Sequence, residues 1–355
     1  MTLAAAFGWL LGCLATLCIL VATCTGGWRL LRRHRERRAA RALDPLRPSA
    51  YQLVIGDPAE VSQALRKLET VDGAAWPPLQ DLLVGLFARV SGEGLAPVRR
   101  LLADRNVLQD ARRDLTACSA VRRGRAAHLL GLVGDSSALP DIERLVSDRD
   151  PEIRVVACRA LGRLGHARAA RTMLTALAGP RSVPAGVVAD ALLGLGPDVQ
   201  DALRDALALP DATARGVAAD VAGLRGFVSL GPALREILAA DGDPDVRARA
   251  ASALGRLGAP AALPHLARAT LPDQPSGVRR AAAEALGALV EPAATEHLRA
   301  LLDAPAMLAD TAARALVRLG PPGLAALQAA ARPGEPSAAA GALAVASLRG
   351  AAWSR

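Results

Sequence analysis

Two stretches of the sequence decide the fold: DPEIR at residues 150–154 leading to ALGRLG at 160–165, and DPDVR at 243–247 leading to ALGRLG at 253–258. They begin 93 residues apart, and 93 is three times 31, so two weaker copies are expected between them. A fixed period of this length is typical of repeat architectures, in which each unit is one small supersecondary motif.

The first glycine of the ALGRLG signature marks one position in each of seven copies. These anchor positions are Gly131, Gly162, Leu193, Gly223, Gly255, Gly287 and Val317. The steps between them are 30 to 32 residues. In five copies an arginine stands eight residues before the anchor: Arg123, Arg154, Arg215, Arg247 and Arg279. The sequence therefore predicts seven repeats over residues 119–332.

Each repeat is predicted to form two helices. In the clearest copies the first helix begins with an N-cap aspartate and a proline, as at Asp150-Pro151 and Asp243-Pro244. It ends at the signature, where glycine supplies a left-handed turn. A single pair cannot cover its own apolar face, so neighbouring pairs must stack. Because Ala and Leu dominate and aromatic residues make up only 2%, we expect an all-α, right-handed α-solenoid of stacked helix pairs.

This pattern resembles HEAT-like repeats, especially the short bacterial type that is also found in phycobilin lyases. The resemblance covers roughly residues 119–332 and implies an armadillo-like helical scaffold. It implies little about function, since such repeats occur in scaffolds, adaptors and a few enzymes. A bilin lyase-like or other ligand-handling enzyme is therefore one alternative, although Phe227 is the one aromatic residue in the repeats.

The ends of the chain are predicted to differ from the repeats. Residues 1–28 carry no charged side chain and contain an apolar run long enough to span a bilayer, so we expect one transmembrane helix. Neither a signal peptide nor a lipoprotein signal fits, because the basic residues follow the apolar run. Residues 29–57 are predicted to be a basic juxtamembrane segment and a linker, the linker being marked by Pro45, Pro48 and Gly56. Residues 58–118 are predicted to be degenerate helical repeats, and residues 333–355 a capping helix.

The positive charge is concentrated just after the apolar run. Of the formal net charge of +9, residues 29–47 carry +6, which leaves +3 for the remainder. The arginines expected to lie at the membrane surface are Arg29, Arg32, Arg33, Arg35, Arg37, Arg38 and Arg41. Such a cluster predicts an inner-membrane, single-pass protein with its N-terminus outside and its repeats in the cytoplasm. The small remaining charge argues against the second alternative, a nucleic-acid-binding solenoid.

Recurring polar residues within the repeats are predicted to be structural. We expect the repeated arginines to bond the capping aspartates or the next repeat, as a ladder through Asp150, Arg154, Arg215, Asp243, Arg247 and Arg279. The five cysteines have no CxxC or Cys/His spacing and predict neither disulfides nor zinc. The chain also lacks the His-Glu steps of dinuclear-iron hydroxylases. No catalytic, metal or cofactor site is predicted.

The remaining expectation is a membrane-anchored scaffold or adaptor that binds a protein partner through the solenoid surface, mainly the second helices. His265 and His297 both follow their anchors by ten residues and should occupy equivalent places on adjacent second helices. The candidate contact residues on these helices are Arg168, Arg171, Arg204, Arg235, Glu236, His265, Arg268, Glu296, His297 and Arg299.

Overall fold

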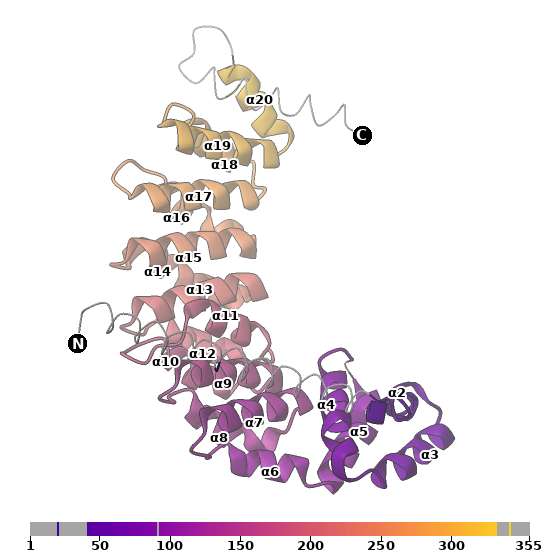
Figure 1. Cartoon of the computed structure of the whole chain (residues 1–355). Coiled ribbons are helices and arrows are strands. Elements are labelled where there is room, and N and C mark those ends of the chain that lie inside the picture. Colours follow the sequence, from indigo (N-terminus) through magenta and orange to yellow (C-terminus); the bar gives the residue numbers. More distant parts are fainter. Residues whose placement is uncertain (1–19, 21–40, 91, 332–340, 342–355) are drawn as a thin grey trace, which may run out of the picture. The chain divides into compact units, whose positions relative to one another are not determined.

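The computed structural model describes residues 20, 41–90, 92–331 and 341 of the chain, and these residues contain helices and no strand. The chain divides into two compact units, Met1–Asp110 and Ala111–Arg355. The all-α prediction is confirmed for the described residues, and the second unit is a solenoid of stacked helices (Figure 1).

The described part of the first unit is a small group of helices around a leucine core. Its helices are α2 (Arg47–Ile55), α3 (Pro58–Glu69), α4 (Trp76–Phe87) and α5 (Ala96–Asp104). A further helix, α6 (Val107–Asp114), lies where the two units divide. Asp57 caps α3 through a capping box with Glu60, and Pro58 starts that helix. Leu53, Leu68 and Leu101 are almost fully buried, so this unit has its own core.

Helix α2 corrects one sequence prediction. Residues 29–57 were expected to be a linker, partly because of Pro48, but Arg47–Ile55 is helical. Pro48 lies in the first turn, where a proline costs no hydrogen bond and favours the start of a helix. Ala50 and Leu53 are buried, and this burial fixes the helix against the rest of the unit.

The predicted membrane localisation is also corrected. In the part of the chain that the structure describes, no helix is long and apolar enough to cross a membrane. The longest helices there have 14 residues, which is about 21 Å at 1.5 Å per residue, against about 30 Å of hydrocarbon. The single-pass, inner-membrane prediction is therefore wrong on this finding. The predicted anchor over residues 1–28 lies outside the described residues apart from Leu20, as do the arginines named with it apart from Arg41.

The second unit consists of helix pairs, and we call the first helix of each pair the A helix and the second the B helix. The A helices are α7 (Ala120–Val133), α9 (Pro151–Leu164), α11 (Ala185–Leu193), α13 (Ala212–Arg225), α15 (Pro244–Leu257), α17 (Ser276–Ala288) and α19 (Ala306–Arg318). The B helices are α8 (Leu139–Leu145), α10 (Ala169–Thr175), α12 (Val199–Ala206), α14 (Gly231–Ala240), α16 (Leu263–Ala269), α18 (Ala294–Arg299) and α20 (Pro321–Ala330). In Figure 1 the A helices α13, α15, α17 and α19 lie one above another like rungs.

Helix ends follow the predicted signals in the clearest repeats. The side chains of Asp150 and Asp243 accept backbone N–H groups in the first turns of α9 and α15. Left-handed glycines end four of the A helices: Gly134, Gly165, Gly226 and Gly258. The glycine that supplies the turn is the second of the signature, three residues after the anchor.

The anchor glycine has a different role, which is to let adjacent A helices approach closely. A Cβ at Gly131, Gly162, Gly223, Gly255 or Gly287 would lie 2.7 Å from the Cα of an alanine in the next A helix. These alanines stand two residues before the next anchor: Ala160, Ala191, Ala253, Ala285 and Ala315. A contact this short has no room for a methyl group, so glycine sets the spacing of the A-helix row.

The predicted capping helix over residues 333–355 lies outside the described residues, except for Gly341.

Candidate functional site

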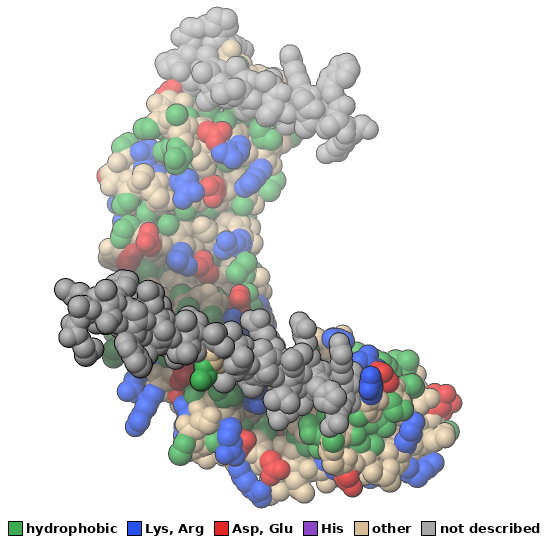
Figure 2. All heavy atoms as spheres, viewed as in Figure 1, with side chains coloured by type: hydrophobic (Ala, Val, Ile, Leu, Met, Phe, Trp, Pro, Cys, Tyr) green, Lys and Arg blue, Asp and Glu red, His purple; other side chains and the backbone are tan. Residues whose placement is uncertain are grey.

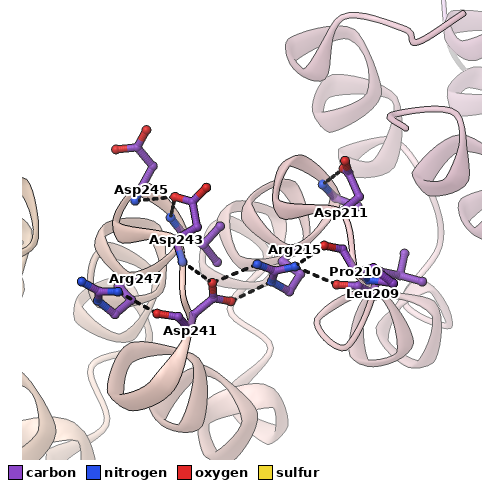
Figure 3. Close-up of polar contacts among 10 residues, drawn as sticks. Leu209, Pro210, Asp211, Arg215, Asp241, Asp243, Asp245 and Arg247 are labelled. Carbon is purple, nitrogen blue, oxygen red and sulfur yellow. Dashed lines mark hydrogen bonds and ion pairs between the residues drawn. The ribbon is translucent and has the colours of Figure 1, made fainter. Parts of the chain in front are cut away.

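Two of the repeated arginines, Arg215 and Arg123, join consecutive helix pairs through part-buried ion pairs. Arg215, in α13, donates from Nε and Nη2 to the two carboxylate oxygens of Asp241, at 2.7 and 2.9 Å (Figure 3). Its Nη1 donates to the carbonyls of Leu209 and Pro210, both at 2.8 Å. Arg123 makes the same bidentate contact to Asp148 at 2.8 Å. Each arginine therefore bonds the loop before its own A helix and the loop before the next one with a bidentate pair.

The partner aspartate stands two residues before the capping aspartate of the next A helix. Asp241 also accepts the backbone N–H of Asp243 at 2.9 Å and is only 5% exposed. The hydrogen bond from Arg215 is the largest influence on the pKa of Asp241, and it holds that pKa below the usual value. Burial raises the pKa of Asp148, but the bonds from Arg123 and the Asp150 amide outweigh it, so its pKa is lowered as well. Of the two arrangements expected from the sequence, Arg123 and Arg215 therefore adopt the bond to the next repeat, through an aspartate two residues before the capping one.

The other ladder arginines are only partly bonded. Arg154 and Arg247 each donate from Nη1 to the carbonyls of the preceding loop, but the Nε atom of each is buried without a partner in the described structure. Asp273 follows Arg247 by the same 26 residues that separate Asp241 from Arg215, yet Asp273 is exposed and accepts from Gln274. Arg279 donates from Nε to the Thr270 carbonyl at 3.0 Å.

The predicted partner residues lie on or beside the B helices. Arg168 is the N-cap residue of α10. Eight of the ten residues are exposed, while Arg235 and His265 are half-buried. Three of the arginines already contact carboxylates of the chain. Arg171 lies 2.7 Å from Asp205, Arg204 lies 2.8 Å from Asp201, and Arg168 lies 3.4 Å from Glu143. The partner surface proposed from the sequence is therefore a row of mixed charge.

A hollow of about 330 Å³ opens in this row beside α14 and α16. Its walls include Leu238 and Ala239 from α14, and His265, Arg268 and Ala269 from α16; Asp273 and Gln274 complete it. The Nδ1 atom of His265 is buried and has no hydrogen-bond partner in the described structure. Buried polar atoms are normally bonded, so this nitrogen is an exception among the described residues. Of the predicted partner residues, this hollow brings together His265 and Arg268.

A second charged surface, which was not predicted from the sequence, lies on the outward side of the A helices. Arg280 and Glu284 of α17 face Arg314 and Arg318 of α19 around a hollow of about 240 Å³. The sequence does show charged residues recurring at two positions of the repeat, three residues before the anchor and one residue after it. That signal is weak, because the same two positions hold His128, Ser252 and Leu224 in other repeats.

The described residues contain no group of three or more His, Cys, Asp or Glu side chains that could hold a metal ion. Cys158 is fully buried in α9, and burial raises the pKa of its thiol to about 12. At neutral pH it is therefore protonated and unreactive.

Comparison with known proteins identifies the repeat. A family model described as HEAT repeats matches residues 110–193, 200–286 and 231–317, which together exceed half of the chain. No curated protein matches the chain in sequence.

Solved structures resemble the fold at low sequence identity. The karyopherin Kap121p bound to the SUMO protease Ulp1p is 13% identical with a TM-score of 0.52, and the match covers 81% of this chain and 38% of the karyopherin. Kap121p bound to the extreme C-terminus of the protein phosphatase Cdc14p is 13% identical with a TM-score of 0.50, covering 84% and 41%. Human deoxyhypusine hydroxylase in complex with glycerol is 22% identical and covers 79% and 98%, but its TM-score of 0.31 carries no argument. The chain thus spans about two fifths of Kap121p.

Proposed function

We propose, on the premise that this chain belongs to the family of HEAT-repeat proteins, that its helix stack is a scaffold or adaptor that binds a protein partner. The B-helix row supplies the contact surface, and the hollow beside α14 and α16 is its centre. The observation that carries this proposal is the hollow of about 330 Å³ itself, where His265 and Arg268 lie beside apolar side chains.

The walls of that hollow suit a side chain of a partner protein. Leu238, Ala239 and Ala269 offer apolar contact, while His265 and Arg268 offer polar groups. Interfaces of this kind concentrate their binding energy in a small desolvated pocket surrounded by a polar rim. The exposed charges of Glu236, Glu296 and Arg299 would form such a rim on the neighbouring B helices.

The solenoid neighbours add support of a general kind. Kap121p has been solved bound to a SUMO protease and to the extreme C-terminus of a protein phosphatase. Stacked helix pairs provide an extended surface for such contacts without needing a catalytic centre.

Site-specific photo-crosslinking tests the proposal. A benzophenone side chain replaces Ala239, which is exposed and lines the hollow, in the full chain expressed in its own cells. The matched control replaces Gln63, an exposed residue of α3. We expect one discrete protein adduct from Ala239 and none from Gln63. Adducts of the same masses from both positions, or none from Ala239, would contradict the proposal.

A further inference from the structure

We propose that the outward side of the A helices α15, α17 and α19 is a second binding surface, which takes an acidic, extended segment of a partner protein. It lies on the other helix of each pair from the hollow that contains His265, so it goes beyond the function proposed above. We call it the A-helix arginine surface, and its residues are Arg249, Arg256, Arg280, Arg314 and Arg318.

The centre of this surface is the hollow between α17 and α19. Arg280 approaches it from α17, and Arg314 and Arg318 approach it from successive turns of α19. Thr311 and Ala315 form part of its lining. Three guanidinium groups around one hollow of about 240 Å³ are an arrangement suited to carboxylates, which they can bind through paired N–H donors.

The existing ion pairs on this surface leave the arginines available. Arg280 and Glu284 are 3.8 Å apart and both about half exposed, and Arg314 pairs with Asp310 one turn away. Exposed pairs within one helix are weak, because water competes and both side chains lose freedom. Arg318 is exposed and has no ion pair among the described residues. A carboxylate of a partner protein therefore has only weak ion pairs to displace.

The charge excess continues onto α15. Arg249 donates to the carboxylate of Asp220, and Arg256 lies 4.0 Å from the same carboxylate. Two arginines thus share one acid. The five arginines of the A-helix arginine surface thus have three carboxylates in their ion pairs, those of Asp220 on α13, Glu284 on α17 and Asp310 on α19. A surface with this balance attracts an acidic partner by charge complementarity.

The spacing of the helices indicates the form of the partner. Packed helix axes lie about 8 to 10 Å apart, and an extended chain advances about 3.3 Å per residue. One acidic residue in every three would therefore meet one A helix after another. Met307 is 75% exposed and lines the same hollow, so an apolar side chain between the acids has a contact as well.

A peptide fits better than a nucleic acid. Figure 2 shows Asp and Glu side chains among the Lys and Arg side chains on the visible face over α15–α19. A phosphate backbone is charged at every nucleotide and would meet these carboxylates at each step. A peptide can place its acidic residues opposite the arginines and neutral residues opposite Glu284 and Asp310.

Fluorescence anisotropy with the full chain tests the proposal. The probe is a fluorescein-labelled twelve-residue peptide that repeats Glu-Ser-Val, and the comparison peptide repeats Gln-Ser-Val. The variant is Arg280→Gln, Arg314→Gln and Arg318→Gln together. The matched control is Arg66→Gln, Arg89→Gln and Arg100→Gln, three exposed arginines outside both proposed surfaces, which removes the same charge.

We expect the acidic peptide to bind, and the A-helix triple variant to raise its Kd by about tenfold, while the control variant changes it less than about twofold. All three A-helix arginines are exposed, so both variants should melt like the parent chain. If the A-helix variant melts early, the single change Arg318→Gln replaces it, and we expect about threefold weaker binding.

Equal weakening by the two triple variants would mean nonspecific charge attraction and would overturn the proposal. Equal binding of the two peptides, no binding of either, or tighter binding of a twelve-nucleotide oligothymidine would also overturn it. Crosslinking from Ala239 is measured on the other row, so this surface can fail while the function proposed above stands.

Discussion

At the scale of single residues, the bidentate ion pair between Arg215 and Asp241 stabilises the contact between two consecutive helix pairs. Both side chains are mostly buried, at 16% and 5% exposed, and the arginine fork matches the carboxylate. A pair of this kind is costly to break from one side, because the remaining charge stays buried without its partner.

The substitution Asp241→Asn should lower the free energy of unfolding by about 2 kcal/mol at pH 7. The pKa of Asp241 is lowered in the folded chain, so its contribution is complete above the unfolded pKa, near 3.9. It is lost as the pH falls through the lower, folded value. The difference between parent and variant in urea unfolding should therefore be constant from pH 5 to 8 and shrink below about pH 4.

The control for this measurement is Asp201→Asn. Asp201 forms an ion pair with Arg204, and its side chain is 85% exposed. We expect an effect of at most about 0.5 kcal/mol. If Asp201→Asn lowered the free energy of unfolding as much as Asp241→Asn, burial would not explain the contribution of the Arg215–Asp241 pair to stability.

The cysteines provide a second prediction at this scale. Cys158 is buried with a pKa of about 12, whereas Cys118 is exposed. N-ethylmaleimide at pH 7.5 should therefore modify Cys118 and leave Cys158 free in the native chain, and modify both in urea. Peptide mapping by mass spectrometry measures this. Equal modification of both in the native chain would mean that α9 opens readily.

Sequence reasoning at the residue scale found the arginines but not their partners. Periodicity shows that an aspartate recurs two residues before the helix cap at 148, 241 and 273. It cannot show that Asp148 and Asp241 turn inward while Asp273 stays exposed, because the path of each loop decides that. Most of the charged candidates on the B helices are exposed, and the ion pairs of Arg168 and Arg171 could not be predicted because they depend on contacts between neighbouring helix pairs.

At the scale of helices, the end of α17 departs from the other A helices. Val290 has φ of +54° at the position where Gly134, Gly165, Gly226 and Gly258 end other A helices. A β-branched residue in the left-handed region is strained, because its Cβ crowds the following carbonyl. The side chain is 63% exposed and so gains little from packing.

Replacing Val290 with glycine should therefore stabilise the chain by about 1 kcal/mol, seen as a higher Tm in calorimetry. The matched control is Leu224→Gly, also at an exposed apolar residue but inside α13 with ordinary helical geometry. That change should destabilise by about 0.8 kcal/mol through lost helix propensity. A lower Tm for Val290→Gly would contradict the interpretation that the backbone of Val290 is strained.

The helix pairs themselves were predictable, because caps, prolines and the 31-residue period all specify the same boundaries. Helix α2 was missed because Pro48 was interpreted as a linker residue, when its place in a first turn favours a helix. The packing role of the anchor glycines was also missed. A glycine near a helix end suggests a cap, and only the neighbouring helix reveals that Gly255 contacts Ala285.

At the scale of the whole stack, each helix pair is stabilised by its neighbours through these glycine–alanine contacts. Each pair packs chiefly against its neighbours, so a stack of this kind behaves as a row of coupled segments. If one contact is lost, the helix pairs on the side with fewer pairs should lose more stability than those on the other side, because fewer interfaces stabilise them.

The contact of Gly287 with Ala315 tests this, since only α19 and α20 lie beyond it in the described stack. A methyl group at Gly287 would lie 2.7 Å from a Cα atom, so Gly287→Ala must push α19 away, at a cost of about 2 kcal/mol. Native-state hydrogen exchange should show α19 and α20 losing protection while α7 and α9 keep theirs. The control is Gly277→Ala, where a Cβ meets nothing within 4 Å. Uniform loss of protection from α7 to α20 would instead mean that the helix pairs unfold as one cooperative unit, since coupling between pairs would then exceed the stability of any single pair.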